Sequence, residues 1–245
     1  MSILPVQKRN LSDDITSQLR RRILSGELLP GDRLESERDL AERLGTNRNT
    51  LREAIRNLET MGLVTVRQGD GVRVVDWRTG GGVMLLAHFL DSAADPEEVM
   101  AVLGDLLRVR AVFVVEVAGR AAETASPEAL AELRRLYELQ KAQWGDVRKV
   151  LGTDFELVAA LVAATGSLVY RWLFNAFSPS YTTFLDRNPG LWVVQPDYLA
   201  SLEKVLAAIE AGDAGAARRA MADHMALADR SVDGFVWRAP EREVS

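Results

Sequence analysis

A short run of arginine, asparagine and threonine side chains begins at Arg48 and ends at Arg52. Arginine pairs bidentately with guanine and asparagine with adenine, so these residue types suit the reading of base edges in a DNA major groove. That chemistry requires them on the exposed face of a helix whose other face is apolar. The positions with the helical spacing of such an apolar face are Leu51, Ala54, Ile55 and Leu58.

Another helix and a hairpin are expected around this segment. Ser36 can cap a helix that Gly45 ends, and Thr46 and Asn47 can cap the next one. After Gly62 the sequence becomes β-prone on both sides of a tip with two glycines at residues 68–71. This order predicts a winged helix-turn-helix whose tip enters a minor groove or lies along phosphates. The alternative is a helical hairpin in a core, with its arginines solvated.

Composition indicates a soluble protein with a packed core, since 47% of the 245 residues are hydrophobic and 27% are charged. The net charge is −5, which at first argues against nucleic acid, but residues 1–78 hold 14 Lys and Arg against 12 Asp and Glu. The remainder holds 16 against 23. Without cysteine, no disulfide or thiolate metal site can form, and without a signal or membrane span we expect a cytoplasmic protein that does not bind membranes.

Beyond the hairpin, the sequence predicts helices and essentially no strands. We expect a DNA-binding domain at 1–76, a linker with a short connecting helix at 77–93, and an all-α effector-binding and dimerisation domain at 94–245. A break is expected where Pro179 interrupts a helical pattern. The predicted fold class is mainly α, a winged helix-turn-helix followed by a helical bundle. No serine lies in G-x-S-x-G, and no phosphate-binding loop or dinucleotide motif is present, so an enzyme is not expected.

The N-terminal segment resembles GntR-type bacterial regulators. Their pattern is a proline-glycine turn, an S/AERELA-like helix and T-R-x-T-x-R-E-A at the start of the recognition helix; here the turn is Leu29-Pro30-Gly31, and the recognition helix opens with TNRNTLREA from Thr46. The resemblance implies that three arginines contact DNA together with the wing tip, where several relatives carry His-Gly. The DNA-contacting residues that we predict are Arg38, Arg48, Asn49, Thr50, Arg52, Gln68 and Gly69.

The remainder resembles the ligand-sensing domain of the FadR branch of this family. Many members hold a divalent metal through one aspartate and three histidines, the first two in D-x-x-x-H. Asp154 and His224 match two of these ligands, whereas aliphatic residues stand at or near the places of the other two, at Val158 and Leu202. Aliphatic side chains donate no lone pair, so we expect no metal and no other cofactor. Asp154 and His224 are then expected to form a buried polar pair.

The acyl-CoA-responsive members of that branch also lack the metal site. They share D-x-x-x-apolar and then A-S/T-G-x-x-x-Y-x-x-x-x-N-x-x-x-x-x-Y, which here runs from Asp154 to Tyr181. The resemblance implies a cavity of aliphatic and aromatic groups with a few polar ones, suited to an acyl chain with a polar head. The alternative makes the tyrosines ordinary core and Arg110 a salt-bridge partner. The ligand-contacting residues that we predict are Arg110, Asp154, Tyr170, Asn175, Tyr181 and His224.

Together these patterns predict a homodimeric, ligand-responsive transcriptional regulator. Two copies related by a dyad would bind the half-sites of a palindromic double-stranded DNA operator. A small effector, such as a long-chain acyl-CoA or a related fatty-acid metabolite, would shift the DNA-competent state. Two alternatives remain open: a regulator that senses a small organic acid, with or without a metal, and an α-helical small-molecule-binding protein or enzyme that does not bind DNA.

Overall fold

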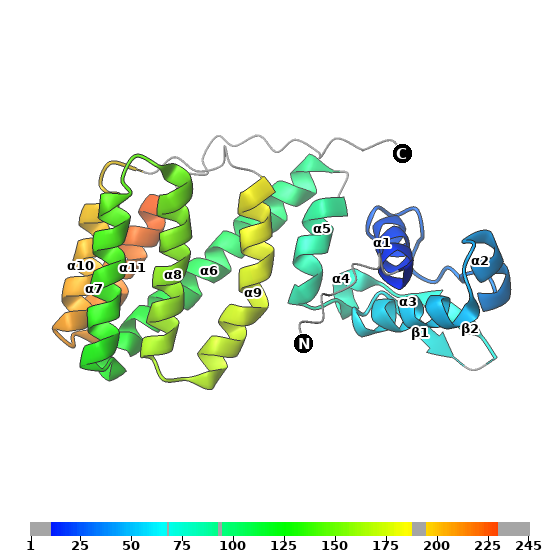
Figure 1. The fold of residues 1–245 in the computed structure, drawn as a ribbon, viewed down its shortest axis with the longest axis horizontal. Helices are drawn as coiled ribbons and strands as arrows, with labels where there is room; N and C mark the ends of the chain where they lie inside the picture. Colours follow the sequence, from blue (N-terminus) through cyan, green and yellow to red (C-terminus); the bar gives the residue numbers. More distant parts are fainter. Residues whose placement is uncertain (1–10, 68, 93–94, 188–194, 230–245) are drawn as a thin grey trace, which may run out of the picture. The chain divides into compact units, whose positions relative to one another are not determined.

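A computed structural model describes residues 11–67, 69–92, 95–187 and 195–229 of the chain. The described residues form two compact units, the first ending at Asp95 and the second beginning at Pro96. The first combines helices with a small sheet and the second is helical, which confirms the predicted fold class (Figure 1). In the described residues no helix is both long enough and apolar enough to cross a membrane.

The first unit is a winged helix-turn-helix. Its elements are α1 (Leu11–Leu24), α2 (Glu37–Arg43), α3 (Arg48–Thr60), β1 (Val64–Arg67), β2 (Gly71–Val74), α4 (Trp77–Gly80), η1 (Val83–Leu85) and α5 (Leu86–Ser92). Strands β1 and β2 pair antiparallel, with Val64 opposite Val74. The chain before α2 lies along β2, because Leu34 N–H donates to the Val72 carbonyl at 2.9 Å and Val74 N–H donates to the Asp32 carbonyl at 2.9 Å.

The predicted apolar face of α3 lies in the core of this unit, where Leu51, Ala54 and Leu58 are fully buried among residues of α1, α2 and the hairpin. The expected linker at 77–93 contains α4, η1 and α5, and its Leu85 belongs to the same core. Gly62 has φ +72°, and a Cβ at that residue would lie 2.8 Å from the Gly80 carbonyl oxygen. Its glycine therefore allows α4 to approach the end of α3 closely.

The second unit is a helical bundle. Its elements are α6 (Pro96–Thr124), α7 (Pro127–Ala142), α8 (Val147–Ala164), α9 (Leu168–Arg187), α10 (Tyr198–Glu210) and α11 (Ala214–Asp229). The long helix α6 packs against α8, α10 and α11, and α7 packs against α8 and α10. The core between them is aliphatic, with Val117, Leu161 and Val205 completely buried. This packing brings residues of α6, α8, α10 and α11 together around the site described below.

Pro179 does not break its helix, and the predicted interruption there is wrong. Helix α9 runs continuously from Leu168 to Arg187 with Pro179 inside it. Proline removes the hydrogen bond to the carbonyl four residues earlier, which belongs here to Asn175. Asn175 is exposed, so water can hydrate a carbonyl that lacks its helical partner. Proline therefore removes one hydrogen bond of the helix, and because Asn175 is exposed the helix continues through Pro179.

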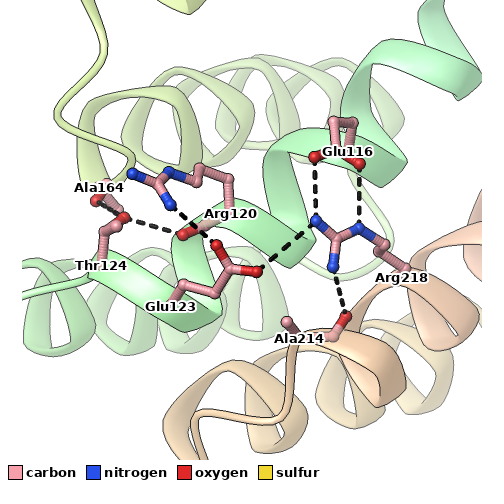
Figure 2. Close-up of polar contacts among 7 residues, drawn as sticks. All are labelled: Glu116, Arg120, Glu123, Thr124, Ala164, Ala214 and Arg218. Atoms are coloured by element: carbon pink, nitrogen blue, oxygen red, sulfur yellow. Dashed lines mark hydrogen bonds and ion pairs between the residues drawn. The ribbon is translucent and has the colours of Figure 1, made fainter.

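An arginine joins α11 to α6, as Figure 2 shows. The Arg218 guanidinium donates to the Glu116 carboxylate from Nε at 3.0 Å and from Nη2 at 2.9 Å, and it lies 3.8 Å from Glu123. Its side chain passes directly over Gly119, where an added Cβ would clash with the arginine stem and guanidinium. Further along α6, the Thr124 hydroxyl lies within hydrogen-bond distance of two carbonyls, that of Arg120 on its own helix at 2.8 Å and that of Ala164 at the end of α8 at 3.0 Å.

Candidate functional site

The amino-terminal end of α3 presents the predicted base-reading residues to solvent. The Asn47 side chain caps the helix and accepts hydrogen bonds from the Asn49 and Thr50 N–H groups, both at 3.0 Å. Arg48 and Asn49 follow this cap and are exposed, while Thr50 is half-buried. Among the described residues Arg48 is in no ion pair. Its guanidinium is therefore available for a base or a phosphate.

The second recognition arginine, Arg52 on α3, is held in place by Glu37 on α2. Arg52 Nε donates to Glu37 Oε2 at 2.7 Å, with 56% of the arginine side chain exposed. Glu37 lies directly after the Ser36 cap, whose hydroxyl accepts from the Asp39 N–H at 3.3 Å. The cap fixes the start of α2, and with it the backbone position of Glu37. Glu37 was not predicted, and no local sequence signal identifies it, because its partner lies 15 residues away on another helix.

The other predicted DNA contacts lie at the edges of this face. The Arg38 side chain is 74% exposed, and its Nε lies 3.7 Å from Asp39. Gly69 is exposed at the wing tip with φ +85°, a left-handed conformation that favours glycine. Gln68 lies outside the described residues. The structure therefore brings Arg48, Asn49 and Arg52 together on one helix and places Gly69 on the separate wing.

The wing carries three arginines that the sequence analysis did not select. Arg73 donates to both Asp70 oxygens, at 2.7 and 2.9 Å, and its hydrogen bond is the main cause that lowers the pKa of Asp70. Arg33 and Arg67 lower that pKa further through their charges. Gly71 leaves room for the Arg33 guanidinium, since an added Cβ would lie 3.3 Å from Nε. With Arg33 and Arg67 beside the Arg73–Asp70 pair, this part of the wing has a positive surface suited to phosphates.

Replacement of Glu37 by glutamine is expected to raise affinity for DNA of any sequence by a factor of about 2–10 at low salt, since it removes a negative charge beside Arg52. The preference for the best sequence should fall, because Arg52 loses the carboxylate that orients it. Fluorescence anisotropy with a duplex selected by the wild-type protein from a random pool, and with its scrambled counterpart, measures both effects.

Glu42→Gln is the matched control, because it removes the same charge from an exposed position of α2. That variant should keep the wild-type ratio of selected to scrambled affinity. An equal loss of preference in both variants would contradict a specific orienting role of Glu37.

A small apolar cavity lies between α6, α8 and α9 of the second unit. It has a volume of about 50 Å³, room for roughly four water molecules. Val109 is 49% exposed, so the cavity reaches the surface beside α6. Phe155 on α8 and Phe174 on α9 both line it and pack against each other, with ring centroids 5.2 Å apart. The lining residues are Leu106, Val109, Arg110, Phe113, Val114, Asp154, Phe155, Val158, Phe174, Phe177 and Ser178.

Arg110 and Asp154 supply the charges in that lining. Arg110 Nη2 lies 3.4 Å from Asp154 Oδ2, and each side chain is 13% exposed. The other carboxylate oxygen of Asp154 accepts a hydrogen bond from the Tyr198 hydroxyl on α10. Burial, followed by the charge of Asp154, raises the pKa of Tyr198 well above its usual value, so this hydroxyl keeps its proton and donates. Tyr198 was not predicted, although it precedes Leu202 by one helical turn.

His224 lies behind Tyr198 on α11. Its ring centroid is 4.6 Å from that of Tyr198, and its Nδ1 is 2.6 Å from Ser201 Oγ. The Ser201 hydroxyl also lies 2.8 Å from the Tyr198 carbonyl, and the imidazole tautomer decides whether Ser201 or His224 donates in the bond between them. Burial lowers the pKa of His224 to about 4. The imidazole is therefore neutral at pH 7.

The structure separates the predicted ligand-contacting residues. Arg110 and Asp154 line the cavity, and Tyr198 contacts both Asp154 and His224, the two residues that were expected to form a buried polar pair. Tyr170 packs edge-on against Phe113 at 6.1 Å, outside the cavity lining. The remaining two are Asn175, which is exposed on α9, and Tyr181, whose side chain lies outside the described residues.

The residues around Asp154 do not fit a divalent metal. Val158 and Leu202 offer no lone pair and are buried, and Asp154 is already engaged by Arg110 and Tyr198. No group of three or more histidine, cysteine, aspartate or glutamate side chains that could hold a metal occurs in the parts of the chain that the structure describes. A cationic guanidinium and a phenol hydroxyl surround the carboxylate instead.

Comparison with known proteins divides the chain in the same order. Residues 11–74 match the family model described as bacterial regulatory proteins of the gntR family, and residues 105–227 match the FCD domain. The HTH-type transcriptional regulator Mce2R of Mycobacterium tuberculosis is 32% identical over 242 residues, which cover 95% of each chain.

Two further relatives have names that mention metabolism. The putative L-lactate dehydrogenase operon regulatory protein of Escherichia coli is 29% identical over 96% of this chain and 90% of its own. The fatty acid metabolism regulator protein of Serratia proteamaculans is 30% identical over 62% of each chain. All three relatives are named as regulators, so DNA recognition by the first unit and small-molecule recognition by the second are the activities to explain.

Proposed function

We propose a function from one premise: this chain belongs to the GntR family of bacterial regulatory proteins and carries an FCD domain. The protein regulates transcription in the cytoplasm, not as an enzyme. Its winged helix-turn-helix binds double-stranded DNA through Arg38, Arg48 and Arg52, with Asn49, Thr50 and the wing tip at Gln68 and Gly69 beside them. Its helical domain binds a small effector that changes the affinity for DNA.

Two copies bind one palindromic operator, because a single head covers only a few base pairs and two heads related by a dyad cover both half-sites. The helical domain supplies the contact between the copies. Helix α9 supports this role through one apolar face, on which the side chains of Leu168, Val169, Trp172 and Leu173 are 42–64% exposed. An exposed apolar face of this kind marks an interaction surface.

The effector carries an apolar chain, as in a long-chain acyl-CoA or a related fatty-acid metabolite. The observation that carries this proposal is the cavity lining, which is aliphatic and aromatic apart from Ser178 and the Arg110–Asp154 pair. A volume of about 50 Å³ holds only the first atoms of such a chain, so binding must widen the cavity. The α9 wall has the weaker packing, since in the described residues the contact of α9 with α8 is less extensive than the main contacts among the other helices of this unit.

A thermal-shift series tests the effector class. Palmitoyl-CoA or palmitate at about 100 times its Kd should add roughly 2.7 kcal/mol to stability by mass action. For a protein of this size that raises Tm by about 5–10 °C. Free coenzyme A and butyrate are the controls, since each lacks the long chain, and neither should shift Tm at the same concentration.

A small organic acid is the second candidate effector. The cavity volume favours it, and one relative is named for an L-lactate dehydrogenase operon. A Tm shift with L-lactate and none with any long-chain compound would replace the acyl proposal by this one. Absence of DNA binding in mobility-shift assays over a range of salt would instead favour an α-helical small-molecule-binding protein or enzyme.

A further inference from the structure

The Arg110–Asp154 pair differs from the other arginine–carboxylate pairs between helices of this unit. Arg134 on α7 donates to Glu203 and Glu210 on α10 through four hydrogen bonds of 2.6–2.9 Å. Arg218 grips Glu116 with two hydrogen bonds of 2.9 and 3.0 Å. Arg110 reaches Asp154 through one nitrogen at 3.4 Å, although this pair is the more deeply buried. The charges are therefore close but poorly matched in geometry.

Asp154 is fixed from the side opposite Arg110. The Tyr198 hydroxyl donates to Oδ1, and the Tyr198 ring is itself held between His224 at 4.6 Å and Trp144 at 6.4 Å. Because Tyr198 is buried, its ring cannot follow a movement of Asp154. The Asp154 carboxylate would therefore lose the hydrogen bond from Tyr198 if it rotated toward Arg110. Arg110 lines the cavity and directly follows Val109, the lining residue that is 49% exposed, so the guanidinium belongs to the part of the lining that is near solvent. An anion that enters from that side meets Arg110 on its way.

We infer that Asp154 is an internal competitor for Arg110, and that the effector's head group is a carboxylate at the end of its apolar chain, which displaces Asp154 from the guanidinium. This inference rests on the proposed effector function and adds the chemistry of the head group. A carboxylate can take two parallel hydrogen bonds from arginine, which Asp154 does not. The released Asp154 keeps its hydrogen bond to Tyr198, so its charge is not left unpartnered.

The prediction is that two variants of one ion pair act in opposite directions. Asp154→Asn preserves the shape and the acceptor for Tyr198 but removes the competing charge, so affinity for palmitate should rise by roughly tenfold. Arg110→Gln should lower affinity for palmitate by roughly tenfold or more. Titration calorimetry with palmitate, palmitoyl-CoA and hexadecanol measures each effect on the full-length protein.

Hexadecanol and Glu203→Gln are the matched controls. Hexadecanol has the same chain without charge, so its affinity should be unchanged in Asp154→Asn. Glu203→Gln removes a carboxylate from an arginine pair that does not line the cavity, and affinity for palmitate should not change. Palmitoyl-CoA carries a thioester in place of the carboxylate at the chain end, and its phosphates lie far from that end. In Asp154→Asn its affinity should therefore rise less than that of palmitate.

Outcomes that overturn the inference are separable from failure of the proposed function. If wild-type protein binds palmitate and both Asp154→Asn and Arg110→Gln weaken it, the pair is structural and the inference falls while the effector class stands. Equal tightening of palmitate and hexadecanol in Asp154→Asn also overturns it, because the effect is then not one of charge. If wild-type protein binds none of the three compounds, the acyl effector and the inference fall together.

Discussion

Replacement of Arg48 by alanine is expected to weaken binding to the selected duplex by about 1–3 kcal/mol, roughly 5- to 150-fold. Arg48 is the first residue of α3, is exposed, and has no ion-pair partner among the described residues. Arg48 can therefore bind DNA without first breaking an ion pair. Arg52, in contrast, must give up its hydrogen bond to Glu37 or bind DNA while keeping it. Competition titrations with single-base variants of the duplex would show a relaxed preference at one base position of each half-site.

The control for this experiment is Arg135→Ala in the helical unit, where the arginine is exposed and pairs with Glu132 within one helix. It removes the same charge and should leave DNA affinity unchanged. If Arg48→Ala weakens selected and scrambled duplexes equally and lowers the salt slope by about one, Arg48 contacts a phosphate and reads no base.

His224 is expected to make the helical unit lose stability as pH falls. Its ordinary pKa is 6.5 and its pKa in the folded protein is about 4, so between these values the unfolded chain binds a proton that the native state does not. This contribution is complete above about pH 6.5 and is lost progressively down to about pH 4. The difference of 2.5 pH units corresponds to about 3 kcal/mol of unfolding free energy.

Urea unfolding of the wild type and of His224→Gln between pH 4 and pH 7.5 measures this effect. The glutamine can still hydrogen-bond to Ser201, and its stability should vary less with pH than that of the wild type by about 3 kcal/mol over the range. The transition of the helical unit must be followed separately, since His88 in the first unit also has a lowered pKa from burial. Identical pH dependence of the unfolding free energy in both proteins would show that protonation of His224 does not destabilise the folded helical unit.

Local chemistry allowed much of the first unit to be predicted. Ser36 and Asn47 cap the helices that they were expected to cap, because a capping side chain binds N–H groups two or three residues away. The apolar face of α3 followed from spacing alone. Glu37 was missed because its partner, Arg52, lies 15 residues away on another helix. Which carboxylate holds which arginine depends on how helices pack, and periodicity does not encode that.

The effector site was less predictable for the same reason. Asp154 and Arg110, which were predicted to contact the ligand, both line the cavity, but Tyr198 joins Asp154 across 44 residues of sequence. A buried tyrosine hydroxyl needs a partner, so Tyr198 could be recognised as buried and polar without its partner being known. The cavity aromatics Phe113, Phe155 and Phe174 follow ordinary helical core spacing, and nothing local distinguishes them from core residues.

The close crossing of Arg218 over Gly119 has a consequence for sequence variation. The space that a side chain at position 119 would occupy is filled by the Arg218 stem and guanidinium, and the same guanidinium bridges Glu116 and Glu123. A side chain at residue 119 therefore requires Arg218 to move or to be replaced. Where relatives carry a larger residue at the position of Gly119, a shorter side chain is expected at the position of Arg218, and the acidic residues opposite should be lost with it. The two helices would then be joined by apolar packing in place of charge.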